Sequence, residues 1–204
     1  MIAIIDYDAG NLRSVQKALN FIGEEATITR DTKILRKADK VILPGVGAFG
    51  EAMNKLHHYG LIPTIQEIAA SNTPFLGICL GMQLMFEGSE ESPNCEGLHL
   101  LPGKILRIPD KVGLKIPQIG WNSLEFMNKA TLYQGLEQHS YVYFVHSYYL
   151  RAANPLDVAA TTDYSTIIDA SVEHGNLFGC QFHPEKSGDV GLQILKNFAN
   201  LKTN

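Results

Sequence analysis

The stretch Phe75-Leu76-Gly77-Ile78-Cys79-Leu80-Gly81 joins a continuous apolar run to a helical pattern through two glycines that flank a cysteine. An apolar run without polar alternation is typical of a strand that is covered on both faces, as in parallel sheets. The pattern of residues 80–86 is helical and begins directly after the cysteine. The stretch therefore predicts a buried strand, a sharp turn at Cys79, and a helix that starts at the turn.

Two earlier strand–helix units repeat this arrangement. Residues 2–5 form an apolar run, and residues 12–22 after it carry apolar side chains at helical spacing. Residues 41–43 form a second apolar run, and helical patterns follow at about 48–58 and 62–70. Alternation of strands and helices predicts an α/β fold with a mostly parallel, doubly wound sheet and helices on both faces.

The second half of the chain is richer in strands. Expected strands cover residues 104–108, 141–149, 158–162, 167–173 and 177–182. His174-Gly175-Asn176 has the composition of a hairpin turn, so part of this half is expected to be antiparallel. A last helix is expected at about residues 190–201. No linker or internal repeat interrupts the pattern, and a single domain over residues 1–204 is expected.

Composition and charge exclude several classes of protein. The 204 residues carry 17 Lys and Arg against 21 Asp and Glu, and 45% of the chain is apolar. This composition argues against disorder, collagen and coiled coil. A mildly acidic chain is a poor match for nucleic acid or an anionic membrane, and no apolar run approaches the roughly 20 residues of a membrane helix.

Cysteines and histidines show no spacing typical of a structural metal site. The three cysteines are scattered, which argues against a disulfide framework and a zinc ribbon. The seven histidines form no helical pair around a glutamate, so no metal and no other cofactor is expected. The first six residues lack the features of a signal peptide, and a cytoplasmic location is expected.

Residues 77–81 match the G-x-nucleophile-x-G elbow, with cysteine in the nucleophile position. In such an elbow the nucleophile projects above the sheet, and the start of the following helix favours a thiolate. The backbone N–H of Leu80 can then point at a developing oxyanion. The alternative is a buried structural cysteine in a glycine-rich turn.

The segment Phe182-His183-Pro184-Glu185 follows another expected strand. A thiol nucleophile needs a base that accepts its proton, and the base needs an acceptor that fixes its tautomer. His183 and Glu185 suit these two roles, and the carboxyl ends of parallel strands lie at one edge of a sheet. The alternative for His183 alone is a loop histidine with no chemical role.

Pro44-Gly45-Val46-Gly47 directly follows the expected strand at residues 41–43. Glycines on both sides of Val46 allow close backbone approach, so an N–H from this segment can complete an oxyanion hole. The alternative is an ordinary turn between a strand and a helix.

Together these motifs resemble the class I glutamine amidotransferases, whose Cys-His-Glu triad hydrolyses glutamine. A narrower resemblance, to the glutaminase subunits of imidazole glycerol phosphate synthases in histidine biosynthesis, runs through the whole chain. Its segments are residues 10–15, 44–49, 77–86, 102–104, 120–122, 144–149 and 182–187. The elbow and His-Pro-Glu mark only the superfamily, whereas Gly-Trp-Asn at 120–122, Val-His-Ser-Tyr-Tyr at 145–149 and Lys-Ser at 186–187 indicate the subfamily.

The resemblance implies a role for each matching residue. Cys79 would be the nucleophile, His183 the general acid and base and Glu185 its orienting acceptor, while Val46 and Leu80 would form the oxyanion hole. Positions that match the site for L-glutamine are Gly45, Gly47, Gln83, Glu91, Ser147 and Tyr148. Positions near the partner interface, where ammonia leaves, are Asn11, Trp121, Asn122 and Lys186.

The implied partner is a cyclase subunit of (β/α)₈ fold that forms a heterodimer with this chain. It would use the ammonia to make imidazole glycerol phosphate and an aminoimidazole carboxamide ribonucleotide. The glycines at 45 and 47 permit a peptide flip in the oxyanion strand. If the strand is misoriented until the partner is loaded, the isolated chain would have low glutaminase activity. Departures from the family pattern are Asp8-Ala9, Gln118-Ile119 and His99, none of them in the triad.

Other functions remain open at this point. The chain can be the glutaminase of a different synthase, in an amino-sugar or cofactor pathway, or a stand-alone γ-glutamyl cysteine hydrolase. It can also be a binding subunit that keeps the triad without using it. Activity without a partner would favour the hydrolase, and an unreactive Cys79 would favour the binding subunit.

Overall fold

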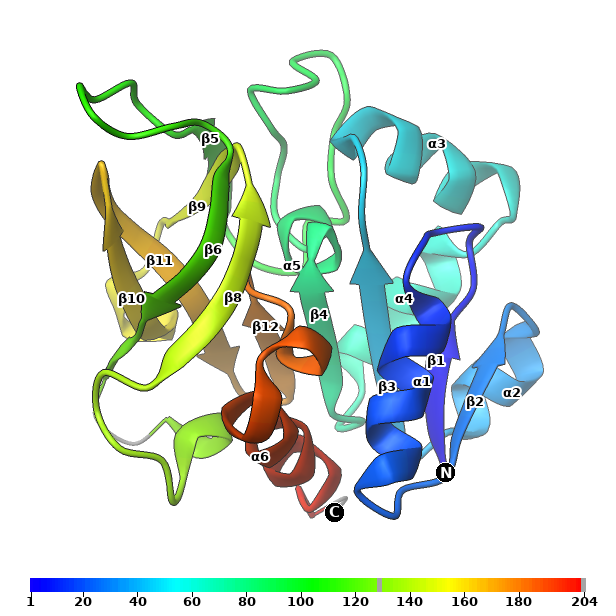
Figure 1. Ribbon diagram of the computed structural model, residues 1–204. Helices are drawn as coiled ribbons and strands as arrows, with labels where there is room; N and C mark the ends of the chain where they lie inside the picture. The colour runs from blue at the N-terminus through cyan, green and yellow to red at the C-terminus, as the bar shows by residue number, and fades with distance from the viewer. Residues whose placement is uncertain (128–129, 203–204) are drawn as a thin grey trace.

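In the computed structural model, which describes residues 1–127 and 130–202, the first half of the chain alternates strands and helices (Figure 1). The strands are β1 (Ile2–Ile5), β2 (Ala26–Thr29), β3 (Lys40–Gly45) and β4 (Phe75–Cys79). The helices are α1 (Leu12–Phe21), α2 (Thr32–Lys37), α3 (Phe49–His58), α4 (Ile62–Ala70) and α5 (Leu80–Leu84). The expected alternation is therefore confirmed.

The second half supplies strands and one long helix. Its strands are β5 (Gly103–Arg107), β6 (Gln118–Ser123), β7 (Glu125–Phe126), β8 (Tyr141–His146), β9 (Tyr148–Ala152), β10 (Val158–Tyr164), β11 (Thr166–His174) and β12 (Leu177–Cys180). Helix α6 (Gly188–Ala199) follows β12 after a 3₁₀ turn at Pro184–Lys186. Within the described residues no helix is long and apolar enough to cross a membrane.

The parallel part of the main sheet runs in the order β2-β1-β3-β4-β12. Strand β12 comes from the far end of the chain yet pairs with β4, with Cys180 opposite Ile78. On the other side of β4, Gly45 of β3 lies opposite Cys79. The carboxyl ends of β3, β4 and β12 thus lie side by side, which is where open α/β sheets form their sites.

Beyond β12 the sheet becomes antiparallel through β11, β10 and β7, and β9 links β11 to β5. Strands β6 and β8 form a separate two-stranded sheet. This arrangement confirms the expected fold, a mostly parallel sheet with flanking helices and an antiparallel second half.

Two apolar layers cover the two faces of the parallel sheet, as the alternation in β1 shows. Ile2 and Ile4 belong to one buried cluster with side chains of α1 and α6. Ala3 and Ile5 belong to the other, with side chains of α2, α3 and α4. In Figure 1, α1 and α6 lie in front of the sheet, with α3 and α4 on its other side. Burial on both faces explains why these strands read as continuous apolar runs.

The structure differs from the sequence expectations at a few short elements. The expected strand over residues 141–149 is two strands, β8 and β9, separated at Ser147. Strand β6, which begins at Gln118, is not among the strands expected from the sequence. Strand β2 and helix α2 were not expected, because β2 is a four-residue edge strand and α2 has only six residues.

Candidate active site

Cys79 lies at the turn between β4 and α5, with backbone angles of φ 54° and ψ −112°. A non-glycine residue rarely adopts this conformation, and surrounding structure must hold it in place. A Cβ atom on Gly77 would lie 2.6 Å from the Met82 Cα, and one on Gly81 would lie 1.8 Å from the Leu43 carbonyl oxygen. Both glycines are therefore required by close packing, and the turn has the geometry of a nucleophile elbow.

Helix α5 is only five residues long, so it provides the first-turn N–H groups of a helix and little of a long helix dipole. The helix dipole that was expected from the sequence to favour the Cys79 thiolate is therefore small. A nearby cation is the other feature that favours a cysteine thiolate.

His183 is the cationic group that the fold brings to Cys79. Its Nδ1 lies 2.7 Å from Oε1 of Glu185, and the two side chains are 1% and 0% exposed. The 3₁₀ turn that carries Glu185 is fixed by Ser187, whose hydroxyl donates to the His183 carbonyl at 2.6 Å. The same hydroxyl accepts from the Tyr143 N–H at 3.0 Å.

Opposing influences act on the pKa of His183. Burial lowers it, but the neighbouring Cys79 and the hydrogen bond to Glu185 raise it more strongly, to about 10. Nε2 of His183 makes no hydrogen bond within the described residues, to the Cys79 thiol or to any other group. Hydrogen bonds between catalytic groups are commonly long in free enzymes and shorten when substrate binds. At neutral pH His183 is therefore held as a cation beside Cys79.

A pocket of about 430 Å³ opens above Cys79. Most of the residues singled out from the sequence line it, and they come from distant parts of the chain: Val46, Gly47, Cys79, Leu80, Gln83, Glu91, Ser147, Tyr148, His183 and Lys186. Glu185 lies behind His183, and Gly45 lies behind the pocket wall. Asn11, Trp121 and Asn122 are also outside the lining.

The Pro-Gly-Val-Gly segment packs directly against the elbow. A Cβ atom on Gly45 would lie 2.9 Å from the backbone nitrogen of Gly81 and 2.6 Å from the Tyr7 hydroxyl oxygen. Gly47 has φ +97°, a conformation that favours glycine, and Val46 is 39% exposed. The segment is thus placed beside Cys79 and is exposed at the residue expected to form the oxyanion hole.

Glu91 lines the pocket and also caps α3, the helix that follows the Pro-Gly-Val-Gly segment. Its Oε2 accepts a hydrogen bond from the Phe49 N–H at 2.7 Å. The next residue, Ser92, accepts from the Gly50 N–H at 3.1 Å. An acceptor at the N-terminus of a helix satisfies backbone donors that otherwise lack partners. Glu91 therefore joins the pocket wall to the Pro-Gly-Val-Gly segment (residues 44–47), which we call the oxyanion segment.

Two buried polar residues were missed by sequence analysis: His146, which lines the pocket, and Gln181, which lies beside Cys79. Gln181 accepts from Gln83 Nε2 at 2.9 Å, and its own Nε2 lies 3.7 Å from the Cys79 Sγ. His146 is bonded to the Tyr148 carbonyl at 2.8 Å, and burial lowers its pKa to about 4. The available signal for Gln181 was its place two residues before His183. The available signal for His146 was its place in the Val-His-Ser-Tyr-Tyr segment at residues 145–149.

The residues expected near a partner interface lie on the surface around the pocket. Trp121 is 55% exposed on β6, between exposed Ile119 and Tyr141. The Asn122 amide donates to the Asp163 carbonyl, and the Asn11 amide donates to Glu185 Oε1. Asn11 therefore contacts Glu185 through its side chain, and Lys186 contacts His183 through its backbone N–H, which donates to the His183 carbonyl at 3.0 Å.

Comparisons with known proteins show which family the chain resembles. The family described as "Glutamine amidotransferase class-I" matches residues 3–201. The chain is 52% identical over 198 residues to the imidazole glycerol phosphate synthase subunit HisH of Bacillus thuringiensis (strain Al Hakam), covering 97% of this chain and 93% of the relative. The same protein of Bacillus mycoides (strain KBAB4) is 50% identical with the same coverage.

Solved structures show the same fold at low identity. A crystal structure of a glutamine amidotransferase has a TM-score of 0.75 at 19% identity, covering 98% of this chain and 100% of the other. A glutamine amidotransferase of Thermotoga maritima has a TM-score of 0.65 at 17% identity, covering 98% and 82%. The fold and the sequence match agree that the chain belongs to the class I glutamine amidotransferase family and, within it, to the HisH subunits of imidazole glycerol phosphate synthase.

Proposed function

We propose that this chain hydrolyses L-glutamine to glutamate and ammonia through a γ-glutamyl thioester on Cys79. The observation that supports this most strongly is the elbow itself. Cys79 shares a pocket with His183, whose other ring nitrogen is bonded to the buried Glu185. A thiol, a base that can also act as an acid, and an orienting carboxylate form a complete set for acyl transfer.

Acylation begins when the Cys79 thiolate attacks the side-chain amide carbonyl of glutamine. The new C–S bond moves the carbonyl electron pair onto oxygen, where the N–H groups of Val46 and Leu80 stabilise it. When the intermediate collapses, the C–N bond breaks and His183 gives its proton to the departing nitrogen. Ammonia and the thioester result, with His183 neutral.

Deacylation uses the same groups in the reverse order. Neutral His183 takes a proton from water as the water oxygen attacks the thioester carbonyl. Collapse of this second intermediate breaks the C–S bond and releases glutamate. The thiolate and the protonated His183 are restored, so the cycle needs no cofactor.

Glutamine has a charged end that the pocket must hold. We propose that Glu91 binds the α-ammonium group, while Gln83 and the Ser147-Tyr148 segment bind the remaining polar groups. Gly47 gives the substrate room beside the oxyanion segment, and Gly45 acts from behind it by letting the segment pack against Gly81.

Two replacements of Glu91 distinguish its proposed role in glutamine binding from its role as the cap of α3. Glu91→Gln keeps an acceptor for the Phe49 N–H but loses the charge, so KM for glutamine should rise about tenfold with kcat and unfolding free energy little changed. Glu91→Ala should raise KM similarly and also lower the free energy of unfolding by about 1 kcal/mol. Steady-state kinetics and urea unfolding measure the two effects. An unchanged KM in both variants would remove Glu91 from the substrate site.

The surface beside the pocket fits a partner that receives ammonia. Strands β6 and β8 expose Ile119, Trp121 and Tyr141, and exposed aromatic residues are enriched in protein interfaces. Free ammonia is mostly protonated in neutral water and then is no nucleophile. We propose that a (β/α)₈ cyclase subunit docks here, with Trp121, Asn122 and Lys186 at the contact, and uses the ammonia for histidine biosynthesis.

The function is tested by measuring ammonia release from L-glutamine with and without the cyclase subunit and its nucleotide substrate. We expect the isolated chain to release ammonia slowly, and the rate to rise strongly when both the cyclase subunit and its nucleotide are added. The reason is that the oxyanion segment can change conformation on docking. High activity without the partner would indicate a stand-alone γ-glutamyl hydrolase. Activity that ignores this cyclase but rises with another synthase would assign the chain to a different pathway.

A further inference from the structure

The loop between β1 and α1, residues 6–11, lies against the oxyanion segment. The hydroxyl of Tyr7 donates to the Pro44 carbonyl at 2.8 Å, in the buried interior. A Cβ atom on Gly10 would lie 2.8 Å from a methyl carbon of Val46. The position of this loop therefore limits where the Pro-Gly-Val-Gly segment can lie.

The last residue of the loop reaches the triad. Asn11 precedes α1 with φ 73°, and its side chain does not cap the helix. Its Nδ2 donates instead to Oε1 of Glu185, the oxygen that also contacts His183 Nδ1. Asparagine is one of the few non-glycine residues that tolerate this left-handed conformation. The Asn11 amide and the His183 ring thus hold the same carboxylate oxygen of Glu185.

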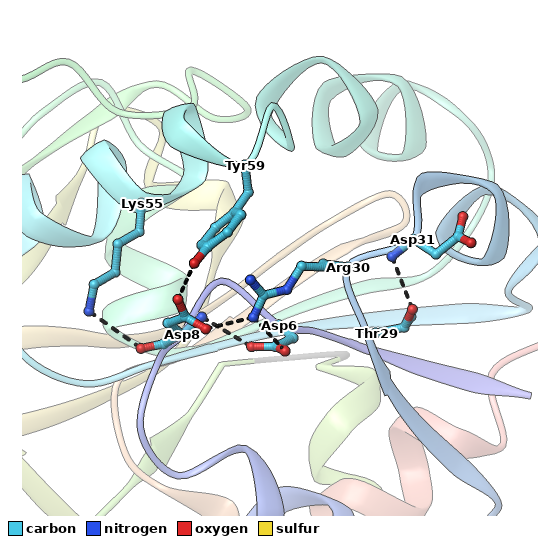
Figure 2. Close-up of polar contacts among 7 residues, drawn as sticks. All are labelled: Asp6, Asp8, Thr29, Arg30, Asp31, Lys55 and Tyr59. Carbon is cyan, nitrogen blue, oxygen red and sulfur yellow. Dashed lines mark hydrogen bonds and ion pairs between the residues drawn. The ribbon is translucent and has the colours of Figure 1, made fainter.

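Asp8, in the middle of the loop, also has a conformation that favours glycine, with φ 60°. Every polar group of Asp8 has a partner that holds it there (Figure 2). Its carboxylate accepts from the Tyr59 hydroxyl and from Arg30, the latter at 2.6 Å. Its N–H donates to Asp6 at 3.0 Å, and its carbonyl accepts from Lys55 at 3.4 Å. A strained residue persists only when neighbours over-determine it in this way.

Arg30 is the centre of this group, which we call the Asp8 cluster: Asp6, Asp8, Arg30, Lys55 and Tyr59. Its guanidinium also donates to Asp6 at 2.8 Å, and its central carbon lies 4.1 Å from the centroid of the Tyr59 ring. The hydrogen bonds from Tyr59 and Arg30 lower the pKa of Asp8, so the pair is charged at neutral pH. Isolated surface ion pairs contribute little to stability, but a network with this many contacts can hold a loop in one conformation.

We propose that Asn11 is a positioning residue for the triad, and that the Asp8 cluster holds its loop in the conformation that delivers the Asn11 amide to Glu185. The proposal rests on the proposed function for the use of the triad, whereas the contacts themselves do not depend on it. With Oε1 held by the Asn11 amide as well as by Nδ1 of His183, Glu185 holds the His183 ring so that Nε2 faces Cys79. Without Asn11, the carboxylate and then the ring gain alternative orientations.

The test uses Asn11→Gly, because glycine tolerates φ 73° and the variant loses only the amide. On the chain alone, kcat for glutamine should fall about tenfold with KM unchanged, the effect of losing one hydrogen bond to a charged group. The second readout is the downfield proton resonance of His183 Nδ1 in ¹⁵N-histidine-labelled protein, identified by its absence in His183→Asn. It should weaken or disappear in Asn11→Gly.

The resonance separates this inference from the proposed function. If wild-type protein hydrolyses no glutamine but Asn11→Gly loses the resonance, the proposed function fails and the positioning role stands. An unchanged resonance overturns the positioning role, whether or not kcat falls. A fall in kcat with loss of the resonance supports both.

Arg30→Met tests the Asp8 cluster, and the chain offers a matched control. Arg36 is similarly exposed and pairs with Glu67 at 2.8 Å, between α2 and α4. Arg30→Met should lower kcat about threefold and weaken the His183 resonance, and Arg30→Lys should restore part of both. Arg36→Met should change neither. Equal behaviour of Arg30→Met and Arg36→Met would overturn the role of the cluster.

Discussion

Replacing Cys79 by alanine is expected to lower glutamine hydrolysis at least 10⁴-fold, to about the detection limit of an ammonia assay. The covalent pathway is lost outright in this variant, and the oxyanion donors alone stabilise only part of the transition state. The pocket should still bind glutamine, because Glu91 and Gln83 remain. The assay is run with the partner and its nucleotide present, so that the wild-type rate is high.

The matched control is Cys95→Ala. Cys95 is partly buried in a loop away from the pocket, and burial raises the pKa of its thiol, so it lacks the features of a reactive cysteine. Its replacement should leave turnover within about twofold. Substantial hydrolysis by Cys79→Ala would mean that the nucleophile is another group or a water molecule.

Replacing His183 by asparagine is expected to lower kcat by about 10⁴, because both steps need proton transfer through this ring. The change also leaves the buried Glu185 carboxylate without its cationic partner, which destabilises the fold. Circular dichroism and urea unfolding therefore accompany the kinetics, and the comparison is made at a temperature where the variant is folded. A folded variant with more than a tenth of wild-type turnover would contradict the assigned role.

The pH dependence gives a finer test of the same residue. His183 keeps its proton below its pKa of about 10 and loses it above, so kcat/KM should fall as pH rises through that value. In Glu185→Gln the carboxylate that raises this pKa is gone, so the fall should move to lower pH. Glutamine itself titrates identically in the assays of the wild-type protein and of Glu185→Gln, so it cannot produce a difference between their pH profiles. Coincident profiles would show that Glu185 does not act on His183.

Sequence alone could predict the parallel half of the fold, and it singled out Cys79, His183 and Glu185 as the proposed triad. Buried strands next to Pro44-Gly45 and Gly77 give strong patterns, because both faces of such strands must be apolar. The short edge strand β2 was missed, and so was β6, the partner of the expected strand β8. Partly polar strands look like loops until the pairing partner is known.

Sequence could not predict the contacts that connect the site to its surroundings. Nothing in the pattern indicates that Asn11 meets Glu185, since the two are 174 residues apart and the fold alone brings them together. In the sequence Asp8 is only a departure from the family pattern, because the Asp8 cluster depends on where Arg30 and Tyr59 lie in space. Gln181 reaches Cys79 for the same reason, through pairing of β12 with β4.

The most direct test of the account is to label the protein with an electrophilic analogue of glutamine and identify the modified residue by peptide mass spectrometry. Modification of Cys79 alone is expected, at a rate that L-glutamine competes away and that the partner with its nucleotide increases. Glutamine hydrolysis by a protein whose Cys79 stays unmodified, or labelling at Cys95 or Cys180 instead, would contradict it.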